Sequence, residues 1–186
     1  MIDFDYIRKQ VKEELVDEPS GHNYAHVMRV FKNVVLIGQT EDVDMDVVKA
    51  AALLHDIAYA KKFFKGEYAK TSHDIARDML KEKYFTTDQI DAILEAIRQH
   101  DVWANYKEDV PVEVKVLRDA DRLDYLGYTG IVKAVSYAAH ANKNIIKLLE
   151  RIIELENEFE TKKGKELSKP RLKITKEFLD GLREEY

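Results

Sequence analysis

A histidine and an aspartate stand side by side in the apolar stretch AALLHDIAYA, residues 51–60. A carboxylate buried without a partner costs several kcal/mol or takes up a proton, so Asp56 needs a compensating charge. Neighbouring residues of a helix project about 100° apart, so His55 and Asp56 can hold one ion only if it lies beside the helix between them. Further ligands for such an ion must then come from other helices.

Two more polar residues interrupt apolar stripes elsewhere in the chain. His26 stands before VMRVF, and Asp121 lies in RDADRLD. A neutral imidazole and a carboxylate from these segments would complete a set of two histidines and two aspartates. Mixed nitrogen and oxygen donors suit Mn²⁺, Fe²⁺, Co²⁺, Ni²⁺ or Zn²⁺ better than Ca²⁺. We therefore expect a divalent metal ion, with Mg²⁺ as a further candidate and the identity open.

The elements that must position these residues are helices. Apolar residues recur three and four apart, and 3 prolines and 7 glycines are the few residues that interrupt the pattern. The segment that begins near residue 86 opens with TTDQ, in which Thr87 is a candidate helix cap. The basic run 162–173 is interpreted as a solvated connection between helices. We expect helices over about 5–16, 23–39, 45–60, 68–84, 86–100, 112–126, 131–141, 145–159 and 172–183.

Composition narrows the classes of protein. The 186 residues are 45% hydrophobic, which suits one domain with a sizeable core, and the lack of cysteine excludes disulfides, iron–sulfur clusters and thiolate zinc sites. A net charge of −5 offers no general positive field for a nucleic acid polymer. The start MIDFDYIRKQ is unlike a signal peptide, and no run nears the roughly 18 apolar residues of a membrane span. We expect a cytoplasmic protein without a membrane partner, with homo-oligomer formation left open.

The ordered motifs resemble those of the HD-domain metal-dependent phosphohydrolase superfamily, named for its His-Asp pair. GHNYAHVMRV, AALLHDI and RDADRLDYLGYTGI look particularly like small stand-alone bacterial and archaeal members, and the match spans about residues 20–135. The resemblance implies an all-α fold, an HD-domain bundle of five or more core helices. The remaining C-terminal helices, about 136–186, are expected to pack on that core within a single domain, 1–186.

The same resemblance implies a metal ion at His26, His55, Asp56 and Asp121, and hydrolysis of phosphate esters or anhydrides. The residue chemistry is compatible, because a bound metal lowers the pKa of its water and polarises a phosphoryl oxygen. The expected substrate is a small phosphorylated molecule, with nucleotides as the favoured class. The alternative is a metal- and nucleotide-binding sensory or interaction module without turnover.

Three further histidines compete for roles near this site. His73 and His100 fall where superfamily members with two metals place additional histidine ligands, so each is a candidate catalytic residue or second-metal ligand. The alternative for both is capping of a helix end. His22 lies four residues before His26 and could share its helical face, either as a contact near the pocket or as a residue of the helix start.

Charged neighbours of the motifs complete the prediction. Arg29 is expected to pair with an aspartate of segment 112–126, or otherwise to contact a phosphate. Asp124 is a candidate for orienting a ligating histidine or Arg122. Lys61 and Lys65, which follow the His-Asp helix, could form a rim that attracts phosphate, the alternative being solvated lysines without a role.

Overall fold

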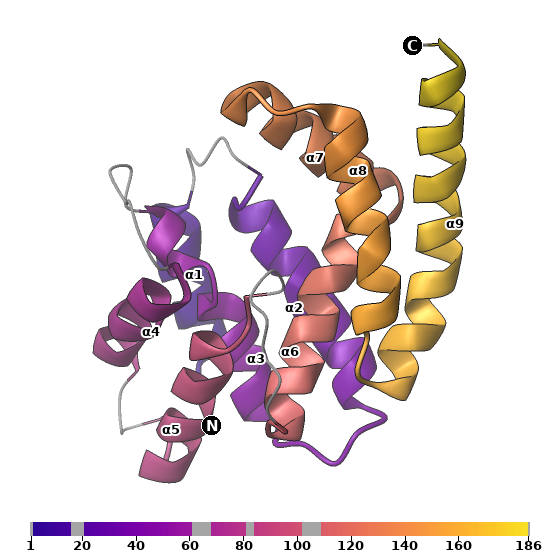
Figure 1. Cartoon of the computed structure of the whole chain (residues 1–186). Coiled ribbons are helices and arrows are strands. Elements are labelled where there is room, and N and C mark those ends of the chain that lie inside the picture. The colour runs from indigo at the N-terminus through magenta and orange to yellow at the C-terminus, as the bar shows by residue number, and fades with distance from the viewer. Residues whose placement is uncertain (1, 16–20, 61–67, 81–83, 102–108, 186) are drawn as a thin grey trace.

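The protein is a bundle of α-helices joined by short 3₁₀ turns (Figure 1). This computed structural model describes residues 2–15, 21–60, 68–80, 84–101 and 109–185, and those residues contain no β-strand. The all-α prediction is confirmed. The helices are α1 (Phe4–Glu14), α2 (Tyr24–Gly38), α3 (Met45–Leu54), α4 (Tyr68–Met79), α5 (Thr87–Arg98), α6 (Val112–Arg122), α7 (Gly127–Ala141), α8 (Ile145–Glu154) and α9 (Lys162–Glu185).

Helix α3 is the centre of the core. Its last five residues, 50–54, are fully buried, and the helix contacts α1, α2, α5 and α6. Asp44 begins the helix by accepting hydrogen bonds from the amides of Asp46 and Val47. Each leucine buried in this way contributes about 1.5–3 kcal/mol to folding, so packing holds the end of α3 firmly in place.

The structure corrects the expected extent of this central helix. The α-helix ends at Leu54 rather than residue 60, and a 3₁₀ turn, Ile57–Ala60, follows. His55 donates from Nδ1 to the carbonyl of Ala52 at 2.8 Å, and the amide of Ala58 donates to Ser72 Oγ at 3.1 Å. These bonds replace helical ones, so the His-Asp pair lies at the end of α3 rather than within it.

Helices α5 and α6 also differ in detail from the prediction. Thr86, rather than Thr87, caps α5: its hydroxyl accepts from the amide of Gln89, whose side chain accepts from the amide of Thr86. Helix α6 ends at Arg122, where a 3₁₀ turn, Leu123–Tyr125, leads into α7. This turn carries Asp124 next to the end of α6 and leads into α7, which contacts α8 and α9.

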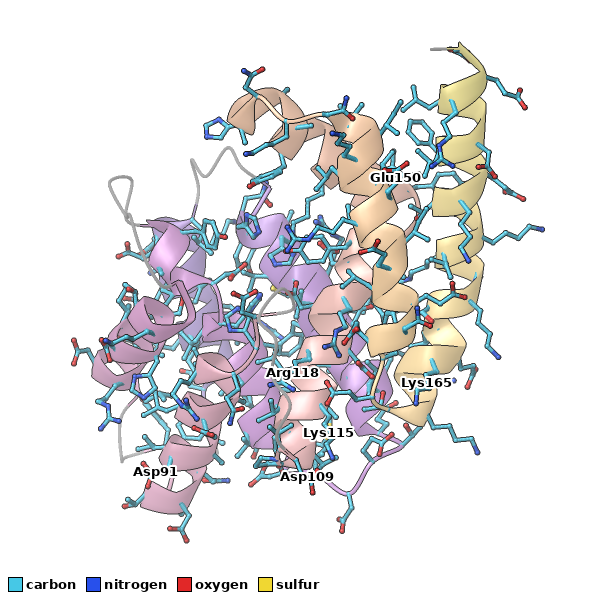
Figure 2. All side chains as sticks on the ribbon, in the orientation of Figure 1. Asp91, Asp109, Lys115, Arg118, Glu150 and Lys165 are labelled. Atoms are coloured by element: carbon cyan, nitrogen blue, oxygen red, sulfur yellow. The ribbon has the colours of Figure 1, made fainter. Side chains whose placement is uncertain are left out.

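The interpretation of 162–173 as a connection is wrong, because this run forms the first half of α9. Gly164, Ser168 and Leu172, four residues apart, are buried, whereas charged side chains such as Lys165 point away from the bundle (Figure 2). Thr161 caps the helix by accepting from the amide of Gly164 at 2.9 Å. This packing outweighs the backbone hydrogen bond that Pro170 cannot make.

Helices α7, α8 and α9 pack together beside the helices that carry the motifs (Figure 1). Among the described residues, none of the helices is long and apolar enough to cross a membrane.

Candidate metal centre and its cavity

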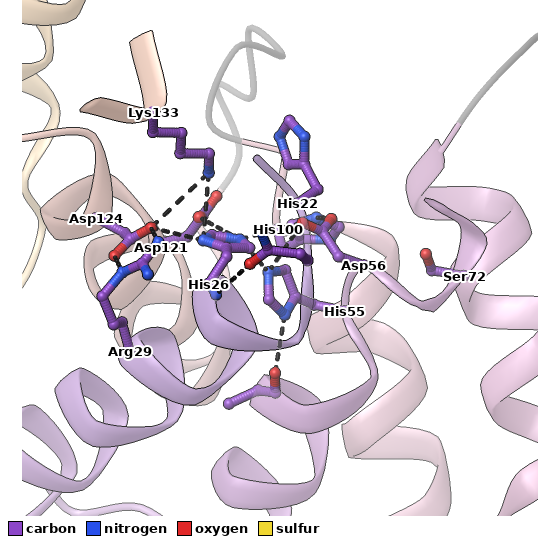
Figure 3. Close-up of polar contacts among 12 residues, drawn as sticks. His22, His26, Arg29, His55, Asp56, Ser72, His100, Asp121, Asp124 and Lys133 are labelled. Atoms are coloured by element: carbon purple, nitrogen blue, oxygen red, sulfur yellow. Dashed lines mark hydrogen bonds and ion pairs between the residues drawn. The ribbon is translucent and has the colours of Figure 1, made fainter. Parts of the chain in front are cut away.

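Four side chains from three parts of the bundle meet at the end of α3 (Figure 3). His26 comes from α2, His55 and Asp56 follow α3, and Asp121 comes from α6. His26 Nε2 lies 3.3 Å from His55 Nε2, 3.1 Å from Asp56 Oδ2 and 3.5 Å from Asp121 Oδ1. The structure thus brings together the four residues that the sequence proposed as ligands.

The hydrogen-bond partners of the two histidines indicate where their protons lie. His26 Nδ1 donates to Asp124 Oδ2 at 2.7 Å, and His55 Nδ1 donates to the carbonyl of Ala52 at 2.8 Å. Both Nε2 atoms are therefore lone-pair acceptors that face each other. Asp121 Oδ1 is also buried there without a hydrogen-bond partner among the described residues.

Acceptors that converge without a proton between them repel one another, so this arrangement needs a cation. Ligand atoms of His26, His55 and Asp56 all lie within 4.8 Å of one another, and Asp121 adds a second carboxylate. The donor set of two imidazoles and two carboxylates fits a divalent first-row transition metal.

Asp124 supports the cluster from the side opposite the shared ligand atoms. It accepts from His26 Nδ1, from Arg29 Nε at 2.5 Å and from Arg29 Nη2 at 2.9 Å. Burial alone would raise the pKa of Asp124, but these hydrogen bonds hold that pKa well below its ordinary value. Asp124 is therefore a carboxylate that fixes the proton and orientation of His26, and the structure places Arg29 in an ion pair with it.

His100 is a fifth member of the cluster. It is buried, its Nδ1 donates to the carbonyl of Ile97 at 2.6 Å, and its Nε2 lies 3.5 Å from Asp56 Oδ1. Burial alone would lower the pKa of His100, but the neighbouring Asp56 carboxylate raises it above its ordinary value. Burial likewise works to raise the pKa of Asp56, yet the surrounding histidines keep it well below the usual range.

The remaining candidates lie in different places. His73 donates to Asp74 at 2.9 Å and contacts Arg77 on α4, so the structure does not bring it to the cluster. Arg122 pairs with Asp119 and Glu160 rather than with Asp124. Lys61 and Lys65 lie outside the described residues.

His22 lies near the site, although it does not share a helical face with His26. Helix α2 begins at Tyr24, so His22 precedes it, and its ring stacks on Tyr59 with centroids 4.0 Å apart. Burial holds the pKa of His22 well below its ordinary value, which keeps the imidazole neutral. Its ring lines a cavity beside the cluster of His26, His55, Asp56 and Asp121.

This cavity has a volume of about 310 Å³ and opens onto Asp56, His100 and Asp121. Helices α7 and α8 form its other wall. The residues of that wall are Lys133, Ala134, Tyr137, Leu148, Arg151 and Ile152. None of these residues was predicted from the sequence, although one signal was present: Lys133 is the single Asp, Glu, Lys or Arg in the whole of 127–141.

Comparison with known proteins agrees with this architecture. The HD domain family model matches residues 23–126. The YpgQ protein of Bacillus subtilis is 33% identical over 135 residues, which cover 71% of this chain and 64% of that relative, so the match spans less than two thirds of the relative's length.

Solved structures of similar fold cover nearly the whole chain. Bacillus subtilis YpgQ in complex with ADP has a TM-score of 0.78 at 24% identity, covering 98% of this chain and 97% of that one. The structure of a Lactobacillus plantarum protein has a TM-score of 0.82 at 24% identity, covering 100% of this chain and 98% of that one. A predicted HD superfamily hydrolase from an uncultured Thermotogales bacterium has a TM-score of 0.75 at 25% identity, covering 99% of this chain and 93% of that one. The chain belongs to the HD domain family.

Proposed function

We propose that this protein is a divalent-metal-dependent phosphohydrolase that acts on a small phosphorylated molecule, with nucleotides as the substrate class. The observation that carries the proposal is the convergence of unprotonated imidazole nitrogens and carboxylate oxygens on the edge of a cavity. His26, His55, Asp56 and Asp121 would hold the metal, which supplies a water of lowered pKa and polarises a phosphoryl oxygen.

Asp124 and His100 orient two of the proposed metal ligands. Asp124 keeps the proton of His26 on Nδ1, so that Nε2 remains a donor of its lone pair. His100 lies against the other oxygen of Asp56 and restricts the orientation of that carboxylate. The volume of the cavity is near the lower end of the roughly 300–1,000 Å³ of small-molecule sites, which supports a small substrate.

Two observations support a nucleotide. The apolar side chains of Leu148 and Ile152, with Tyr137 beside them, offer a surface against which a base and sugar can pack. The YpgQ structure of similar fold contains ADP. The net charge of −5 gives no comparable support for a nucleic acid polymer as the substrate.

Turnover of a substrate panel tests the activity. The Mn²⁺-loaded protein is incubated with nucleoside mono-, di- and triphosphates and with other phosphate esters, and released phosphate and pyrophosphate are measured. We expect release from at least one nucleotide and a loss of more than about 100-fold in Asp121→Ala, because a ligand contributes more than a supporting residue. Asp180→Ala, an exposed change on α9, is the matched control. A metal-loaded protein that releases nothing from any compound would favour the non-catalytic binding module.

Metal content tests the centre independently of turnover. Elemental analysis should find a divalent metal in the wild type and much less in Asp121→Ala. Added Mn²⁺ should raise the free energy of unfolding of the wild type by about 2.7 kcal/mol at 100 times the dissociation constant, because it binds the folded state. Equal metal content in both proteins would discard the proposed ligand set.

A further inference from the structure

Lys133 brings a buried positive charge to the wall of the cavity. It comes from α7, its side chain is 4% exposed, and it lines the cavity together with His22 (Figure 3). Its Nζ lies 3.2 Å from His26 Nδ1 and 3.9 Å from Asp124 Oδ2. The ammonium therefore stands directly beside the metal cluster, on a helix that lies beyond the family match at 23–126.

These neighbours do not satisfy the ammonium. His26 Nδ1 carries the proton that it donates to Asp124, so it cannot also accept one from Lys133. Asp124 already accepts from His26 and from Arg29, and 3.9 Å is longer than a hydrogen bond. The 3.2 Å contact with His26 Nδ1 can occupy at most one of the three N–H donors of Lys133, so within the described part of the chain at least two of these donors lack an acceptor at hydrogen-bond distance. A buried ammonium in this state calls for an anion.

The stem of Lys133 is held so that the charge faces the cavity. The ammonium lies 4.0 Å from the centroid of the Tyr125 ring, a cation–π contact that stabilises the charge without using its hydrogen bonds. The backbone of Gly21 also approaches the stem: Gly21 has φ +95°, and a Cβ there would lie 2.9 Å from Lys133 Cγ. The missing side chain of Gly21 is what lets the backbone approach the lysine stem so closely.

We propose that Lys133 is the anion-binding residue of the cavity and binds a phosphoryl oxygen of the substrate. For the identity of that substrate the inference rests on the proposed function. The compact ammonium suits a phosphate as a point charge, and a charge-assisted hydrogen bond formed away from bulk water is strong. The phosphate then lies at Lys133 within the cavity, which also opens onto Asp56 and Asp121, while the organic part of the ligand packs against Leu148 and Ile152 of α8.

Calorimetric titration tests this role without turnover. The Mn²⁺-loaded protein is titrated with adenosine 5′-(α,β-methylene)diphosphate, in which the bond between the phosphorus atoms resists hydrolysis, and with adenosine. Lys133→Met keeps the length of the stem and removes the charge. Lys143→Met removes an exposed lysine just after α7 and is the matched control. We expect Lys133→Met to bind the diphosphate analogue about 10- to 100-fold more weakly, Lys143→Met to bind as the wild type does, and adenosine to bind all three proteins alike.

Metal content of each variant is measured alongside, and Lys133→Gln serves as a second variant with a polar side chain. Unchanged affinity for the analogue in both Lys133 variants would overturn the proposal. So would loss of metal from them, since the lysine would then act on the cluster rather than on the ligand. A wild-type protein that does not bind the analogue also contradicts it. If binding depends on Lys133 but no compound is hydrolysed, the proposed function fails and the anion site stands.

Discussion

At the scale of single residues, the site depends on which nitrogen of each histidine carries the proton. Asp124 and the carbonyl of Ala52 each accept from a histidine Nδ1, and this leaves the Nε2 atoms of His26 and His55 free to bind a cation. Asp124 would therefore act on a bound metal through His26. The ion pair with Arg29 fixes the carboxylate in that position.

Replacing Asp124 tests this indirect role. Asp124→Asn can present its amide nitrogen to His26 and no longer favours the proton on Nδ1. We expect Mn²⁺ affinity to fall by about 10- to 100-fold, measured by competition with a chromophoric chelator. Asp180→Asn changes an exposed aspartate in the same way and should leave the affinity unaltered. Wild-type affinity in Asp124→Asn would show that His26 keeps its orientation without the carboxylate.

At the scale of elements, the ends of helices position the chemistry. Helix α3 ends at the His-Asp pair, and α6 ends just after Asp121. The residues directly before α9 are joined to α6 by Asp119, which is buried and accepts from the amides of Glu160 and Thr161. This contact requires close approach, because a Cβ on Gly164 would lie 2.4 Å from Asp119 Oδ2.

We expect alanine substitutions at two glycines of α9 to have opposite effects on the free energy of unfolding. Gly164→Ala should lower the free energy of unfolding by about 1–3 kcal/mol, because the methyl group pushes on Asp119 and Thr161. Gly181→Ala, which meets nothing within 4 Å, should raise it by about 0.5–1 kcal/mol through helix propensity. Urea unfolding measures both. Equal effects of the two substitutions would mean that α9 does not pack closely on α6.

At the scale of the whole molecule, the C-terminal helix braces the turn after α6, which carries Asp124 and closely follows Asp121. Arg171 of α9 donates to the carbonyl of Leu123 at 2.8 Å and to Asn33 Oδ1 at 3.1 Å. Asn33 in turn donates to the carbonyl of Ala120 at 2.9 Å. Helices α2, α6 and α9 are thereby tied together directly behind Asp121.

Removing this tie should weaken both the fold and the metal centre. Arg171→Met leaves the carbonyl of Leu123 and the amide oxygen of Asn33 without that donor, so we expect the free energy of unfolding to fall by about 1–3 kcal/mol. Mn²⁺ affinity should fall as well, because the turn after Asp121 loses support. Lys173→Met, exposed on the same helix, is the control for both measurements. A variant with lowered stability and unchanged metal affinity would show that α9 supports the fold alone.

Much of the architecture could be predicted because it depends on local pattern. The apolar period predicted the helices, and the order of the motifs predicted His26, His55, Asp56 and Asp121, which the fold brings together. Local pattern gave the wrong helix boundaries where contacts between residues far apart in the sequence set those boundaries. The end of α3 at Leu54 depends on Ser72, and the helical start of α9 depends on Asp119.

By itself, the sequence determined the fold class and the donor types, because helical periodicity and the chemistry of imidazole and carboxylate are properties of the chain. Only the tertiary structure decided which polar residues share the site. His73 and His100 were equal candidates, yet α5 brings His100 to Asp56, whereas His73 faces Asp74 on α4. The same holds for Lys133 of α7, whose place beside His26 of α2 results from the packing of helices far apart in the sequence. Packing between helices sets the distances between these side chains, and those distances cannot be inferred from the spacing of residues in the sequence.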